Sequence, residues 1–168
     1  VGAGGRSFRM AVRGSYLPQK TGPQKSIGIP SAFAPDVCQG PDGRYYLYYA
    51  FDFLGIMSVA VCDTPAGEYK FLGHIHYADG TLWGRRRGDQ LPFDPGVLAD
   101  DDWCVWLYCG FYIAVPVILT GGHKLRCDGG TVLELEKDMV TIKTEPRVIF
   151  PKKGPGAFQG HEFFQARS

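Results

Sequence analysis

The sequence contains an internal repeat in which residue n matches residue n+60. The matched pairs are Phe33 and Phe93, Pro35 and Pro95, Val37 and Val97, Asp42 and Asp102, Tyr46 and Trp106, Leu47 and Leu107, Tyr48 and Tyr108, and Phe51 and Phe111. Each copy reads as an aromatic residue, a proline, a valine, an acidic turn and an alternating aromatic strand. A period of this length with several strands per unit is typical of radially arranged four-stranded blades. The repeat therefore predicts a β-propeller.

Composition favours the same all-β class. The 168 residues include 23 glycines and 12 prolines, and 14% of the chain is aromatic. Glycine and proline weaken helix interiors, so this mixture disfavours a helix bundle and favours short strands joined by turns. A hydrophobic content of 45% excludes a disordered chain, and a net charge of +1 argues against a dedicated nucleic-acid-binding protein.

Strand-like segments alternate with turn signals along most of the chain. We expect strands at 44–51, 55–62, 68–73, 103–111, 131–136 and 140–150. No long stretch shows a helical period, so the helix content should be very low. Residues 103–120 carry no charge but contain Gly110, Pro116 and many aromatic or β-branched residues. This pattern favours two buried strands with a bend between them over a membrane helix.

Several motifs together resemble glycoside hydrolase family 43. They lie at 34–37 (Ala-Pro-Asp-Val), 41–49, 93–98, 132–135, 138–139 and 160–164 (Gly-His-Glu-Phe-Phe). The resemblance covers residues 31–168 and implies a five-bladed propeller and an inverting enzyme for arabinose- or xylose-containing glycans. Five blades of about 60 residues need roughly 300 residues, so the chain is expected to hold about two and a half blades. Residues 1–30 would form a loop-rich connector or the end of blade one, and 31–168 blades two, three and the start of four.

The resemblance also implies the positions of the catalytic carboxyl groups. Inverting hydrolysis needs a general acid and a general base, and a neighbouring carboxylate can raise the pKa of the acid. In the repeat Ala34 matches Asp94, which corresponds to the family's pKa-tuning aspartate. The alternative for Asp94 is a residue that starts a turn before a proline. The acid position holds Gln165, whose carboxamide cannot act as an acid, and the base would lie before residue 1. Glu162 is the nearest other carboxyl, but residues three apart in a strand face opposite sides.

Three further residues are candidates for substrate binding. Phe33 and Asp36 precede a predicted strand where the resembled family lines its sugar pocket, and His161 precedes the acid segment. Phe33 suits either stacking on a sugar ring or a place in the core. No cofactor is expected to be required and no metal site is predicted. Calcium occurs in some members of the family, but no ligand set for it is visible, and the acidic run 100–102 matches a hairpin turn in the repeat.

Two functions therefore remain open. One is a glycosidase of the β-xylosidase or α-L-arabinofuranosidase type that is inactive as this fragment. The other is a non-catalytic carbohydrate-binding or degenerate propeller. The expected partner is a pentose-containing oligo- or polysaccharide, without nucleic acid or membrane, and open blade edges favour self-association. An odd set of five cysteines without a CxxC pair, and no visible signal peptide, predict a cytoplasmic protein.

Overall fold

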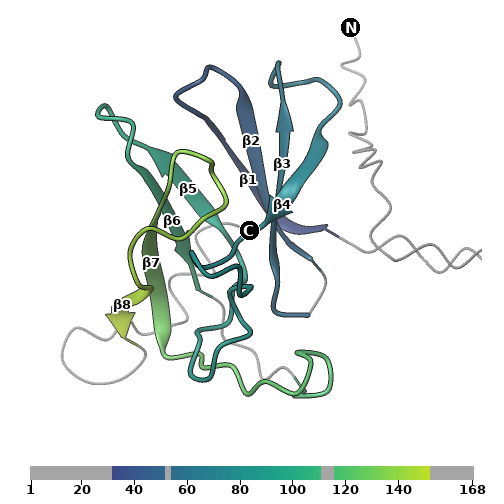
Figure 1. Cartoon of the computed structure of the whole chain (residues 1–168), viewed down its shortest axis with the longest axis vertical. Helices are drawn as coiled ribbons and strands as arrows, with labels where there is room; N and C mark the ends of the chain where they lie inside the picture. The colour runs from purple at the N-terminus through teal and green to yellow at the C-terminus, as the bar shows by residue number, and fades with distance from the viewer. Residues whose placement is uncertain (1–31, 52–53, 111–115, 152–168) are drawn as a thin grey trace, which may run out of the picture.

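The computed structural model describes residues 32–51, 54–110 and 116–151, and within these ranges the chain is all-β, without a helix. The strands are β1 (Ala32–Gln39), β2 (Tyr45–Phe51), β3 (Met57–Cys62), β4 (Lys70–His74), β5 (Gly96–Ala99), β6 (Val105–Cys109), β7 (Gly129–Leu135) and β8 (Arg147–Pro151). They form two antiparallel sheets in the orders β1-β2-β3-β4 and β5-β6-β7-β8 (Figure 1). The predicted connector (1–30) and the predicted start of a further blade lie outside the described residues.

The backbone confirms the internal repeat at two separate positions. Ala34 and Asp94 both have a left-handed conformation, with φ of 46° and 56°. Gly43 and Trp103 share the same feature in the hairpin turns that follow, with φ of 80° and 60°. This conformation is rare for residues other than glycine and especially for bulky ones. Its occurrence at both members of two matched pairs shows that the two copies have the same local fold.

The two sheets use opposite faces to contact each other, as successive blades of a propeller do. Tyr48 of β2 lies in the core cluster between the sheets, whereas its repeat partner Tyr108 is 38% exposed. Leu107 of β6 lies in that same cluster, whereas its partner Leu47 packs in a separate cluster of the first sheet. The first sheet thus meets the second through the face of β2 that bears Tyr48, and the second meets the first through the face of β6 that bears Leu107. The described chain forms two blades of a β-propeller.

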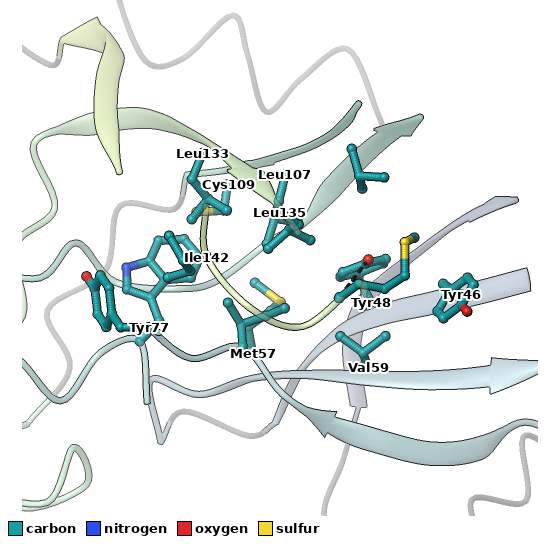
Figure 2. Close-up of a cluster of buried hydrophobic side chains, with 14 residues drawn as sticks. Tyr46, Tyr48, Met57, Val59, Tyr77, Leu107, Cys109, Leu133, Leu135 and Ile142 are labelled. Atoms are coloured by element: carbon teal, nitrogen blue, oxygen red, sulfur yellow. Dashed lines mark hydrogen bonds between the residues drawn. The ribbon is translucent and has the colours of Figure 1, made fainter. Parts of the chain in front are cut away.

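The core between the blades is apolar and well buried. Its buried members are Tyr46, Tyr48, Met57, Val59, Ile75, Tyr77, Trp83, Val105, Leu107, Cys109, Leu133, Leu135, Met139 and Ile142. Figure 2 shows that the labelled side chains from the two sheets point toward one another. The Tyr48 hydroxyl, which has no exposed surface, donates a hydrogen bond of 3.0 Å to the carbonyl of Met139. This bond joins the two blades and satisfies two buried polar groups.

The first strand of each blade was not predicted. Asp94-Pro95-Gly96 resembles a turn in sequence, and β5 that follows has only 4 residues. Phe33 and Asp36 were expected to precede a strand, but both lie within β1. A β-bulge between them contains the left-handed Ala34 and the proline, which explains why the alternating pattern is absent there.

The prediction of a second buried strand within 103–120 is wrong for the part that the structure describes. Residues 116–120 form turns, in which the Pro116 carbonyl accepts a 2.9 Å hydrogen bond from the Leu119 N–H. Ile118 at the centre of these turns is 86% exposed. Proline and the left-handed Gly121 and Gly122 favour a turn here despite the apolar composition. In the described ranges no helix is long and apolar enough to span a membrane.

The strand predicted at 140–150 begins later, at Arg147. The Asp138 carboxylate accepts hydrogen bonds from the backbone N–H groups of Val140 and Thr141, at 3.1 and 2.9 Å. These bonds hold the turn at 137–140, and residues 141–142 form only isolated β-bridges, to His76 and Leu135. Pro146 lacks the N–H group that a sheet ladder needs, which further delays the strand.

Candidate functional site

A cavity of about 560 Å³ lies against the β5–β8 sheet. It is lined by Asp36, Asp94, Pro95, Gly96, Val97, Leu98, Tyr108, Cys109, Gly110, Gly130, Thr131, Ile149 and Phe150. Two of the predicted site residues, Asp36 and Asp94, therefore meet at the same cavity although they belong to different blades. The remaining lining residues are mostly apolar, and Thr131 and Tyr108 are among those with polar side chains.

Asp94 is carried by a bend between Phe93 and Pro95. Its left-handed backbone is sparsely populated for residues other than glycine, although aspartate adopts it more readily than most. The residue before it is anchored, because the Phe93 carbonyl accepts a 3.2 Å hydrogen bond from the N–H of Gly110. Phe93 is itself buried, whereas Asp94 is half-buried. The bend thus places a carboxyl group at the cavity wall on a well-anchored segment.

Asp36 reaches across the boundary between the blades. Its Oδ2 accepts a hydrogen bond of 2.8 Å from the backbone N–H of Val97, a residue of β5. A bond from a backbone N–H to a carboxylate is charge-assisted and stronger than one between neutral groups. The position predicted to bind substrate therefore makes a contact between blades and also lines the cavity.

Two thiols lie near these carboxyl groups, the half-buried Cys38 and the buried Cys109. Burial raises the pKa of Cys38 to about 12, and the negative charge of Asp36 adds to this effect. Burial also raises the pKa of Cys109 well above its usual range; the Asp94 charge adds to the rise, and a hydrogen bond with the Phe93 backbone opposes it. Since the nucleophilic form of cysteine is the thiolate, both groups stay neutral and unreactive at ordinary pH.

Of the two alternatives for Phe33, sugar stacking or a place in the core, its surroundings favour the core. Its ring lies 6.0 Å from that of Phe93, centroid to centroid, and it packs against the buried cluster of Ala50, Leu91 and Phe93. The side chain is only half-buried, so a part of it remains accessible. Stacking of Phe33 on a sugar stays a prediction.

The other predicted site residues lie outside the described ranges. These are His161, Glu162 and Gln165, so the structure gives no account of the acid position.

The acidic run 100–102 forms the hairpin turn that the repeat predicts. The Asp100 carboxylate accepts hydrogen bonds from the backbone N–H groups of Asp102 and Cys104, at 3.1 and 2.8 Å, and from the Trp106 indole at 3.1 Å. Its oxygens thus hold the turn. Within residues 32–51, 54–110 and 116–151 no group of three or more His, Cys, Asp or Glu side chains is arranged to hold a metal ion.

Tyr108 and Thr131 are cavity residues that sequence reasoning missed. Tyr108 faces away from the core because Leu107 beside it faces inward, and neighbouring residues of a strand point to opposite faces. The sequence shows that residues alternate along β6, but it does not show which face of β6 meets the other blade.

Comparisons with known proteins give one family. Residues 14–165 match "Glycosyl hydrolases family 43". A xylosidase/arabinosidase from Thermoclostridium stercorarium is 49% identical over 140 residues, which are 81% of this chain and 28% of that protein. An extracellular endo-alpha-(1->5)-L-arabinanase from Thermotoga petrophila is 31% identical over 123 residues, covering 61% of this chain and 24% of its own length. The chain thus spans about a quarter of the length of these curated relatives. A solved α-L-arabinofuranosidase from Clostridium thermocellum has 25% identity and a TM-score of 0.45, over 69% of this chain and 34% of that one.

Proposed function

Since the chain belongs to glycosyl hydrolases family 43, we propose that the protein containing it hydrolyses glycosidic bonds in arabinose- or xylose-containing glycans. The observation that carries this proposal is the meeting of Asp36 and Asp94 at one cavity, with Asp94 on an anchored bend. The relative from Thermoclostridium stercorarium, at 49% identity, carries the name xylosidase/arabinosidase, which supports a pentose-containing substrate.

The proposed mechanism is inversion with two carboxyl groups on opposite sides of the sugar. One donates a proton to the leaving oxygen, and the other removes a proton from the attacking water. We assign Asp94 to a third role, the tuning of the acid. A negative charge beside a carboxyl group disfavours its ionised form and raises its pKa, so the acid keeps its proton near neutral pH.

A second candidate function is carbohydrate binding without hydrolysis. Gln165 at the acid position favours it, because a carboxamide cannot donate the proton that the leaving oxygen needs. Glu162 is the alternative acid, three residues away. Replacing Gln165 by Glu in the gene product separates the two functions. A gain of aryl-glycoside hydrolysis supports the glycosidase, and sugar binding that persists without hydrolysis supports the binding protein.

The test of the Asp94 role is the variant Asp94→Asn in the gene product that contains these residues, made both in the wild type and beside Gln165→Glu, so that a carboxyl group is present at the acid position. Because general acid catalysis contributes about 100-fold or more, kcat for 4-nitrophenyl β-D-xyloside or α-L-arabinofuranoside should fall by roughly that factor. The basic limb of the pH profile should move to lower pH, because the acid loses a neighbouring negative charge. Asp101→Asn, the same chemical change at an exposed turn residue, is the control. An unchanged kcat in Asp94→Asn would refute the assignment.

A further inference from the structure

The bend that carries Asp94 is anchored on both sides. Before Asp94, the Phe93 carbonyl accepts the N–H of Gly110 at 3.2 Å, a contact within the same blade. After it, the N–H of Val97 donates to the Asp36 carboxylate at 2.8 Å, a contact that comes from the preceding blade. A strained, left-handed residue persists only where its surroundings determine it, so the two anchors together hold the Asp94 conformation.

The repeat shows that the carboxylate of the second anchor is not repeated in the next copy. Asp36 corresponds to Gly96 in the next blade, so the copy that carries Asp94 offers no carboxylate at the matching position. In the same frame Asp94 corresponds to Ala34, which cannot take part in acid–base chemistry. The Asp36 carboxylate of one copy thus anchors the following copy, which carries the Asp94 carboxyl group.

We propose that Asp36 is a positioning residue for Asp94, which it acts on through the Val97 N–H. Its carboxylate fixes the start of β5 relative to β1 and thereby sets where the Asp94 side chain enters the cavity. This inference rests on the proposed function, because the catalytic role of Asp94 is assigned there. The earlier expectation that Asp36 binds substrate is a different role, and the two differ in what they predict for KM.

Two variants of Asp36 weaken its hydrogen bond with the Val97 N–H to different extents. In Asp36→Asn an oxygen acceptor remains, but the negative charge is lost and the bond to Val97 weakens. In Asp36→Ala the acceptor is removed altogether. A positioning role predicts a larger loss of kcat for Ala than for Asn, on the order of 100-fold against 10-fold, with KM within about twofold of the wild type. A direct contact with the sugar would instead raise KM in both variants.

The geometry is tested separately, by NMR on the same gene product that the kinetic experiments use. The Val97 amide should exchange with solvent about 10-fold faster in Asp36→Ala, because its hydrogen bond is lost. The backbone chemical shifts of Asp94 should move away from those of a left-handed residue. Asp101→Asn should change neither. The melting temperature of each variant shows whether a loss of activity exceeds what the loss of stability explains.

The outcomes separate this inference from the proposed function. If Asp94→Asn loses activity while Asp36→Ala keeps it, the positioning role is wrong and the function stands. If Asp94→Asn keeps full activity, the assigned role of Asp94 fails, and the NMR data alone decide whether Asp36 holds the bend. Unchanged Val97 exchange and unchanged Asp94 shifts in Asp36→Ala would overturn the inference in either case. A kcat loss matched by a proportional loss of stability would do so as well.

Discussion

Truncation of Leu107 should show how strongly the two blades stabilise each other. Leu107 is fully buried in the cluster that joins the sheets. Leu107→Ala removes the equivalent of three methylene groups, worth about 2.4 kcal/mol at about 0.8 kcal/mol each. The cavity left between two sheets that cannot close adds to this, and buried Leu→Ala changes cost about 2–5 kcal/mol in total. We expect a loss of about 3–4 kcal/mol.

The matched control is Leu72→Ala, the same chemical change in β4 at a side chain that is 39% exposed. It forms no closed cavity and should cost about 1 kcal/mol or less. Urea unfolding followed by tryptophan fluorescence and by circular dichroism measures both losses. Because the cluster includes both sheets, the two signals should change in one transition. Equal losses for the two variants, or separate transitions for the two probes, would refute the account of the core.

Three further predictions concern backbone strain and pH. Gly84→Ala should lower the free energy of unfolding by about 3 kcal/mol, because φ is 91° and a Cβ would lie 2.3 Å from the Gly55 carbonyl oxygen. Gly80→Ala, at φ 81°, places its Cβ in open space and should lower it by only about 1–2 kcal/mol. Thermal melts measure the difference. Burial and the Arg85 charge lower the pKa of His74 below its ordinary 6.5. The stability that His74 contributes is therefore present above pH 6.5 and is lost as the pH falls from there through the lower pKa of the folded state. His74→Gln should flatten the dependence of the melting temperature on pH between about 8 and 5. Burial and the hydrogen bond to Asp42 raise the pKa of Tyr46 to about 12. The stability that Tyr46 contributes is therefore full below pH 10 and declines as the pH rises toward 12. In Tyr46→Phe the free energy of unfolding, measured in urea at each pH, should decline less steeply.

The repeat made much of the fold predictable. It placed Ala34 opposite Asp94 and the turn at Gly43 opposite Trp103, and the shared left-handed backbone confirms both matches. The tryptophan shows what the repeat adds. Taken alone, a tryptophan gives no reason to expect a positive φ, because its bulk disfavours that region. Only its correspondence to a glycine indicates the conformation.

What could not be predicted depends on contacts distant in sequence. The hydrogen bond from the Val97 N–H to Asp36 joins residues 61 positions apart, and no local sequence pattern predicts it. The short strand β5 follows Pro95 and begins at Gly96, residues that local propensity assigns to turns, and it forms because β6 pairs with it. The exposed apolar residues near Ile118 have the composition of a buried strand but form turns, because proline and glycine override hydrophobicity there.

The shared bend at Ala34 and Asp94 also bears on how such a protein evolves. Alanine and aspartate codons can differ by a single base, and the backbone at both positions already has the conformation that aspartate tolerates. A point mutation can therefore add or remove a carboxyl group at either blade without a new loop or a new strand. Duplication of a blade copies a ready framework for a reactive group, and selection then needs to act only on the side chain. Hydrolytic and purely sugar-binding descendants of one gene can diverge by such steps while their sheets remain the same.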